Sequence, residues 1–216
     1  MYKIFLSPSN QFENKYAGMN TNEGEQMGKV AVALRKSLLR CGFGVMLMHD
    51  YSMDKKVVEA NNYRADLYVP IHSNACNGKA SGTRLFCYSK PGKGYEACLT
   101  ILRRLGIVTP GKPDVINIDP DLVEVHMPKA PTAYIEVDFH DVPDIAKWIT
   151  NHIDDIAEAI CHGICDYFYV PYVSPEVKPT KLYRVQVGAF SKKENAQKML
   201  AEVQKYYSDA FITVGE

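Results

Sequence analysis

Residues 66–75 read Asp-Leu-Tyr-Val-Pro-Ile-His-Ser-Asn-Ala, and this stretch decides the fold class of the chain. It is apolar almost without interruption up to His72, as expected of a strand that is covered on both faces. Strands of this kind belong to largely parallel sheets with helices packed on both sides. The stretch therefore predicts an α/β domain with His72 at the carboxyl edge of its sheet, where open α/β sheets bind their ligands.

Strand and helix patterns alternate on both sides of this stretch. Further strands are expected at 3–7, 45–49, 83–89 and 132–137, and helices at 23–41, 54–63, 94–105 and 144–169. Helices of this length between short strands predict a three-layer α/β sandwich, with a mixed, mostly parallel central sheet flanked by helices. We assign residues 1–169 to this domain.

Composition and charge exclude several classes of function. The chain has 25 Lys and Arg against 25 Asp and Glu, so it lacks the basic excess of a nucleic-acid binder. No run approaches the ~18 consecutive apolar residues of a membrane span. The apolar N-terminal run, residues 1–6, is too short for a signal peptide. We expect a chain made in the cytoplasm, with no nucleic-acid partner, no membrane span and reduced cysteines.

The character of the chain changes at residue 170. Residues 170–180 contain three prolines and no periodicity, which predicts a linker. Residues 182–187 and 210–214 then alternate as strands around a helix at 192–207, so 181–216 form one small βαβ unit. A lone unit of this size buries too little apolar surface to be stable, and a second copy of the chain would supply the missing half.

Three polar side chains lie at positions where chemistry is expected. His72 ends a buried strand, and Glu136 lies inside the apolar run 134–137, where a carboxylate is costly unless a metal, a partner or a catalytic role compensates it. Glu23 lies in the first turn of a helix. Each has a structural explanation when taken alone: a satisfied core histidine, a strand-end glutamate, or a glutamate that favours the helix dipole.

Cys161 and Cys165 form a second pair that could bind a metal. Their spacing of four places both thiols on one face of a helix, where they could ligate zinc. The favoured interpretation is that small apolar thiols pack on the core.

Taken together, four stretches resemble the zinc-dependent N-acetylmuramoyl-L-alanine amidases of bacteria and their phages. They follow one another in the order and spacing of that family across residues 2–168. The stretches are Leu6 to Gln11, Asn22-Glu23 at a helix start, Ile71 to Ala75, and Ala133 to Phe139.

The resemblance implies a zinc ion held by Glu23 and His72, with Glu136 as the general base. The family's first zinc ligand, a histidine after the first strand, has no counterpart in this chain. The family has Asp-Pro-Gly-His-Gly where this chain reads Ser-Pro-Ser-Asn-Gln at 7–11. Asn10 falls at the histidine position and Gln11 follows it with a longer reach. Either amide is a candidate ligand, although an amide oxygen is a weaker donor than imidazole.

The implied reaction is hydrolysis of the amide between N-acetylmuramic acid and L-alanine in peptidoglycan. Zinc would acidify a water molecule and polarise the scissile carbonyl, and Glu136 would transfer the proton. Asn74, His126 and His140 are expected to line the cleft and bind the substrate. The alternative is a degenerate amidase fold that binds peptidoglycan without zinc or catalysis, since the first histidine is missing.

The C-terminal stretch 183–190, followed by Asn195-Ala196, resembles the first half of a SPOR domain. Such domains recognise the glycan strands of peptidoglycan, so the implied partners are glycan strands and stem peptides. Only one of the two usual βαβ halves is present, which predicts a homodimer through residues 181–216. The whole resembles an endolysin that reaches the wall after phage or prophage release, or a host enzyme of mother-cell lysis.

Overall fold

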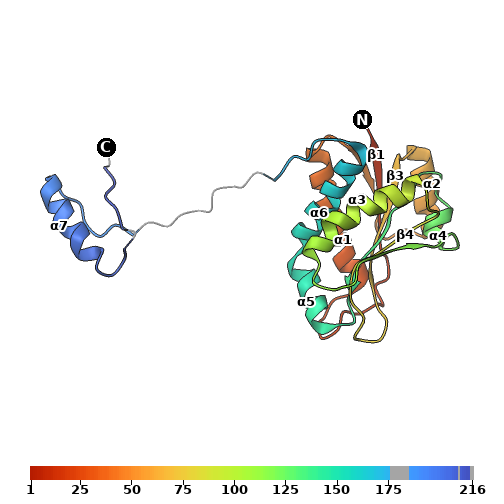
Figure 1. The fold of residues 1–216 in the computed structure, drawn as a ribbon, viewed down its shortest axis with the longest axis horizontal. Coiled ribbons are helices and arrows are strands. Elements are labelled where there is room, and N and C mark those ends of the chain that lie inside the picture. The colour runs from red at the N-terminus through yellow and green to blue at the C-terminus, as the bar shows by residue number, and fades with distance from the viewer. Residues whose placement is uncertain (176–184, 209, 215–216) are drawn as a thin grey trace. The chain divides into compact units, whose positions relative to one another are not determined.

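A computed structural model of the chain describes residues 1–175, 185–208 and 210–214. The chain divides into two compact units, Met1–Pro175 and Glu176–Glu216, and each is described by itself (Figure 1). Within the described residues, no helix combines the length and the apolar character needed to cross a membrane.

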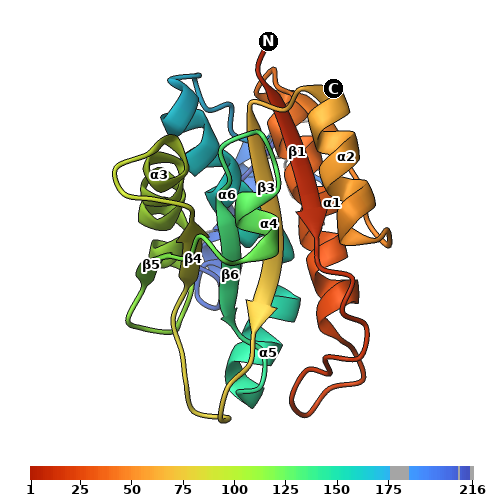
Figure 2. The ribbon, with the colours of Figure 1, turned by 90° about the vertical axis from the view of Figure 1, so that its right-hand side faces the viewer.

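A six-stranded sheet with the strand order β2-β1-β3-β6-β4-β5 forms the centre of the first unit (Figure 2). The first four strands in this order are parallel to one another, while β4 runs antiparallel to β6 and parallel to β5. The predicted mixed, mostly parallel sheet is confirmed. The strands are β1 (Lys3–Pro8), β2 (Gly44–Leu47), β3 (Leu67–Asn74), β4 (Arg84–Cys87), β5 (Val115–Ile118) and β6 (Tyr134–Phe139).

Helices cover both faces of this sheet, as the sequence predicted. The helices α1, α3 and α6 pack on one face, and α2 and α4 lie on the other (Figure 2). The helices of this unit are α1 (Glu23–Arg40), α2 (Met53–Tyr63), α3 (Lys93–Val108), α4 (Val123–His126), α5 (Pro143–Asn151) and α6 (Ile153–Phe168).

Alternate residues of the central strands enter separate apolar clusters. In β1, Ile4 and Leu6 pack in the larger cluster together with Met27 of α1. Phe5 lies on the opposite face and stacks on Tyr68 of β3 at 5.4 Å. The apolar run of β3 is thus buried on both faces, for the reason inferred from its sequence.

Asp138 of β6 holds the segments that precede β4 and β5 by hydrogen bonds to their backbone. Its carboxylate is fully buried and accepts hydrogen bonds from the backbone N–H groups of Gly82, Gly111 and Phe139 at 2.8–2.9 Å. Gly82 has a φ of +97°, and a Cβ on Gly111 would lie 2.4 Å from an Asp138 oxygen. The two glycines therefore let the backbone approach the Asp138 carboxylate closely.

The prediction of one continuous helix over 144–169 was wrong. The structure has two helices, α5 and α6, that meet at His152, whose φ of −124° is not helical. The His152 ring nitrogen Nδ1 lies 2.8 Å from the Trp148 carbonyl oxygen. A side chain thus contacts a carbonyl of the last turn of α5, and the apolar spacing that continues across the break gave no sign of this.

Two short elements were absent from the sequence prediction. The strand β5 and the helix α4 have four residues each. Segments of this length show too few repeats for either periodicity to be detected. Their places are set by contacts with the rest of the sheet.

The predicted linker began too early, because its residues 170–175 belong to the first unit. The hydroxyl of Tyr172 donates to Glu158 at 2.6 Å, and Arg40 Nε donates to the carbonyl oxygen of Val173 at 2.8 Å. The remainder of the predicted linker, residues 176–180, lies outside the described residues.

The second unit contains the predicted helix, α7 (Lys193–Val203). The predicted strands are not formed in its described residues 185–187 and 210–214, and residues 182–184 lie outside the description. None of the α7 residues is buried. A strand requires a neighbour that takes up its backbone hydrogen bonds, and one helix with two segments offers little apolar surface to hold such a pair.

Candidate active site

The site forms at the carboxyl ends of β1, β3 and β6, beside the first turn of α1. His72 of β3 and Glu136 of β6 are direct register partners on adjacent parallel strands, so their side chains leave the same face of the sheet. Glu23 opens α1, where the side chain of Asn22 caps the helix by accepting from the N–H of Glu25 at 2.9 Å.

The buried ring of His72 lies between two carboxylates. Its Nδ1 is 2.8 Å from Glu23 Oε1, and its Nε2 is 3.3 Å from Glu124 Oε2. The ring stacks on Tyr134, with 4.7 Å between the centroids. Both nitrogens of the imidazole are therefore occupied by acidic groups, and the plane of the ring is fixed.

Burial, hydrogen bonds and charge shift the pKa values of His72, Glu23 and Glu124. Burial lowers the pKa of His72, but hydrogen bonds to Glu124 and Glu23 outweigh it and raise that pKa to about 9. Burial raises the pKa of both glutamates, but the hydrogen bond and charge of His72 outweigh it and lower each of them. At neutral pH and without a cation, an imidazolium thus lies between two carboxylates.

Glu136 is the acid–base candidate in this group. Its Oε2 is shielded from solvent and has no hydrogen-bond partner among the described residues. Burial raises the pKa of Glu136 to about 7, the charges of Glu23 and Glu124 act in the same direction, and the charge of His72 opposes them. A carboxylate that exchanges its proton near neutral pH suits a general base.

Of the two amides predicted near the site, Gln11 lies beside His72. Its Nε2 is 3.5 Å from His72 Nδ1, and its Oε1 accepts from Asn14, which also donates to Glu23 Oε2 at 2.8 Å. The side chain of Asn10 lies elsewhere, since it donates to the carbonyl oxygen of Tyr51 at 3.0 Å.

Of the three predicted substrate-binding residues, Asn74 and His140 lie together and His126 lies apart from them. His140 is buried, stacks on Tyr16 and lies 3.0 Å from the hydroxyl of Ser73. Asn74 ends β3 at the same edge, and its carbonyl oxygen accepts from the N–H of His140. His126 is exposed at the end of α4. Asn74 and His140 thus lie together, while His126 is separate from their hydrogen bonds.

Glu124 is the member of the site that the sequence analysis missed. It lies on α4, and its Oε1 accepts from the hydroxyls of Ser7 at 2.6 Å and Tyr68 at 2.8 Å. One signal was available, because Glu124 interrupts the apolar run 122–125 in the way that Glu136 interrupts its strand.

Cys161 and Cys165 have a neighbour that the sequence did not indicate. Cys41, at the end of α1, joins them, and the three buried sulfurs lie within 4.8 Å of one another. Among the described residues, no fourth His, Cys, Asp or Glu completes this group, whereas structural zinc sites have four ligands. The thiols pack in the apolar core, which agrees with the favoured interpretation.

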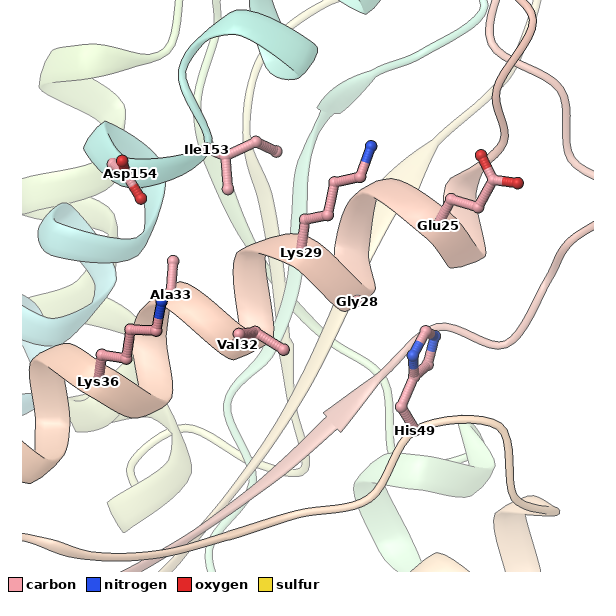
Figure 3. Close-up of a pocket in the computed structure, with 9 residues that line it drawn as sticks. All are labelled: Glu25, Gly28, Lys29, Val32, Ala33, Lys36, His49, Ile153 and Asp154. Carbon is pink, nitrogen blue, oxygen red and sulfur yellow. The ribbon is translucent and has the colours of Figure 1, made fainter.

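A separate surface pocket of about 410 Å³ lies along α1 and includes His49 and Ile153 (Figure 3). Its lining contains none of the predicted site residues. Glu25, Lys29 and Lys36 project from α1 around it (Figure 3). The pocket is therefore separate from the site that Glu23, the first residue of α1, helps to form.

The donors at the site suit a divalent cation. Zinc accepts nitrogen and oxygen ligands of the kinds found here, namely the imidazole of His72, the carboxylate of Glu23 and the amide oxygen of Gln11. The unpartnered buried oxygen of Glu136 is costly without a compensating charge. Fold and site together define an α/β protein with a buried acid–base centre that fits a metal ion.

Comparison with known proteins identifies the family. Residues 13–166 match the N-acetylmuramoyl-L-alanine amidase family, and residues 179–215 match the SPOR domain. The chain belongs to the N-acetylmuramoyl-L-alanine amidases, and peptidoglycan amidase activity is its function. The predicted resemblance is confirmed. The match begins after the segment 7–11, in which the family's first histidine is absent.

Two curated relatives span almost the whole chain. The sporulation-specific N-acetylmuramoyl-L-alanine amidase of Bacillus subtilis is 27% identical over 98% of this chain and 84% of its own length. The amidase CwlM of Bacillus licheniformis is 28% identical over 98% of this chain and 85% of its own. Both carry the activity in their names.

Solved structures support the fold. The catalytic domain of the amidase CwlV from Bacillus (Paenibacillus) polymyxa var. colistinus has a TM-score of 0.72 at 15% identity, covering 79% of this chain and all of that domain. The catalytic domain of the CD27L endolysin, which targets Clostridia difficile, has a TM-score of 0.66 at 21% identity, covering 77% and 98%.

Proposed function

We propose that this amidase uses a zinc ion held by Glu23 and His72, with Gln11 as the ligand from the loop after β1 and Glu136 as the general base. The observation that carries the proposal is the convergence of Glu23 Oε1 and Gln11 Nε2 on Nδ1 of His72, at 2.8 and 3.5 Å. A half-turn of the Gln11 amide would bring its oxygen, the ligating atom, to the place of Nε2. An ion at that nitrogen would meet a carboxylate, an imidazole and an amide at once.

When bound, zinc supplies the positive charge that polarises the scissile carbonyl and acidifies a water molecule. Glu136 takes the proton of the attacking water and passes it to the departing nitrogen of L-alanine. Its Oε2 is available for this step because no other described group occupies it. Asn74 and His140 at the same sheet edge are proposed to contact the substrate, together with the exposed His126.

The alternative of a non-catalytic peptidoglycan-binding module is disfavoured by the match of residues 13–166 to the amidase family. The observation behind it is the amide pair Asn10 and Gln11 at the position where the family has a histidine. A site that is too weak to retain zinc would bind the wall without cleaving it. Such a protein would contain no zinc and would release no stem peptides.

The first prediction concerns the base. Glu136→Gln keeps the size of the side chain but removes the proton acceptor, so we expect the rate of wall digestion to fall by about 100-fold or more. Folding and zinc content, measured by circular dichroism and atomic absorption, should stay unchanged. Exposed Glu13→Gln is the control, with unchanged rate. An active Glu136→Gln protein with normal zinc contradicts the assignment.

The second prediction concerns the ligand from the loop after β1. Gln11→His should tighten zinc binding by about 10-fold or more, because imidazole is the better donor. Asn10→His should leave it unchanged, because this side chain is directed to the Tyr51 carbonyl. Competition with a chromophoric chelator measures both. If Asn10→His tightens binding and Gln11→His does not, position 10 supplies the ligand instead.

We further propose that the enzyme acts on the wall after release from the cell, in mother-cell lysis or as a phage or prophage endolysin. The names of two similar proteins support this proposal. The Bacillus subtilis relative is called sporulation-specific, and one protein with this fold is an endolysin.

The second unit is proposed to bind glycan strands and to join two chains into a homodimer. Its described residues expose several apolar side chains, among them Val185 at 90%, Phe211 at 73% and Val214 at 96%. Apolar surface of this kind is typical of an interface. Two units related by a twofold axis would cover each other's apolar residues and pair their extended segments.

Light scattering tests this dimer. The full chain of 24.3 kDa should scatter as a particle of twice that mass, while residues 1–175 should be monomeric because they lack the second unit. A monomeric full chain, or a truncated chain that remains dimeric, contradicts the dimer.

A further inference from the structure

We propose that Glu124 is a positioning residue that holds the Nε2–H of His72 and thereby directs Nδ1 toward the metal ion. The inference rests on the proposed zinc site, and it assigns a role to a carboxylate that the sequence analysis did not single out and that the resemblance does not include.

The two carboxylates flank opposite nitrogens of one ring. Glu23 lies 2.8 Å from Nδ1, on the side where the Gln11 amide also lies, and Glu124 lies 3.3 Å from Nε2. A neutral imidazole carries one proton and one lone pair, so one nitrogen donates while the other ligates. With the ligand set on the Nδ1 side, Nε2 bears the proton, and Glu124 accepts it.

Glu124 is itself held in place by two neighbouring strands. Its Oε1 accepts from Ser7 of β1 at 2.6 Å and from Tyr68 of β3 at 2.8 Å. This leaves Oε2 directed at His72, and the whole side chain is buried. The carboxylate thus has two fixed donors on one oxygen and the ring on the other, which makes it a rigid support.

The geometry disfavours Glu124 as a direct ligand. One ion cannot be bound by both nitrogens of the same ring, because their lone pairs point in different directions. Glu23 and the Gln11 amide lie at Nδ1, whereas Glu124 lies at Nε2 on the other side of the ring. Glu124 therefore acts on the ion through His72.

A carboxylate in this position strengthens the ligand that it contacts. It fixes the tautomer and orientation of the imidazole and raises its basicity, and losing such a partner costs about 10–100-fold in metal affinity. The effect matters here because the loop after β1 places only the Gln11 amide near Nδ1. A firmly oriented His72 offsets part of the zinc affinity that is lost because an amide takes the place of a histidine.

The test is the zinc affinity of full-length E124Q. The substitution preserves shape, and the hydroxyls of Ser7 and Tyr68 can turn to accept from the new amide, so the fold is expected to persist. Competition with a chelator should show about 10–100-fold weaker zinc binding. The exposed Glu13→Gln variant is the matched control and should bind zinc like the wild type.

A second readout reports the proton directly. Long-range ¹H–¹⁵N spectra of the zinc-loaded, ¹⁵N-histidine protein should show His72 protonated at Nε2 in the wild type. If the proton is at Nδ1 instead, or if E124Q binds zinc as tightly as the wild type, the inference is overturned.

Two further outcomes are also decisive. If E124Q does not fold, Tyr68→Phe replaces it, since that change removes one donor to Glu124 and should weaken zinc binding several-fold; unchanged binding overturns the inference. If the wild type binds no zinc at all, the proposed metal site fails and this inference fails with it. Zinc binding by the wild type without loss in E124Q contradicts the role of Glu124 alone.

Discussion

The imidazole of His72, buried between two carboxylates, is the interaction on which the site depends. A histidine in this position is tolerated because Glu23 and Glu124 satisfy its nitrogens and Tyr134 covers its face. Three parts of the fold meet at this ring: the start of α1, the helix α4 and the end of β3. The cost of burying the acids and the imidazole separately is avoided because they are paired. Glu136 lies beside this group with a buried Oε2 that has no hydrogen-bond partner among the described residues.

The sequence was sufficient for the parts of the site that lie on regular elements. The apolar run ending at His72 and the carboxylate within 134–137 fix both residues on buried strands, and the register then places them side by side. The start of α1 was predicted from the helical spacing of the apolar residues that follow Asn22. The parts that could not be predicted lie where tertiary contacts decide. Glu124 lies on a four-residue helix, and the choice between Asn10 and Gln11 depends on the course of the loop after β1.

The second unit also contains elements that could not be predicted from local sequence patterns. Its helix follows from the local pattern, but the two predicted strands are not formed in the described residues. Strand pairing depends on a neighbour, and alternating apolar residues cannot supply one. Residues 179–215 nevertheless match the SPOR domain, and completion of this unit by a second chain stays a prediction.

Cleavage at the lactyl–alanine bond by a metal-loaded His72 site is the central claim of this account. Digestion of purified peptidoglycan, analysed by mass spectrometry, tests it most directly. Zinc-loaded protein should release stem peptides with free L-alanine amino termini, and removal of zinc with a chelator should stop the release until zinc is restored. Intact stem peptides, or cleavage at another amide, would contradict the account, as would digestion that continues at full rate in protein shown to be free of metal.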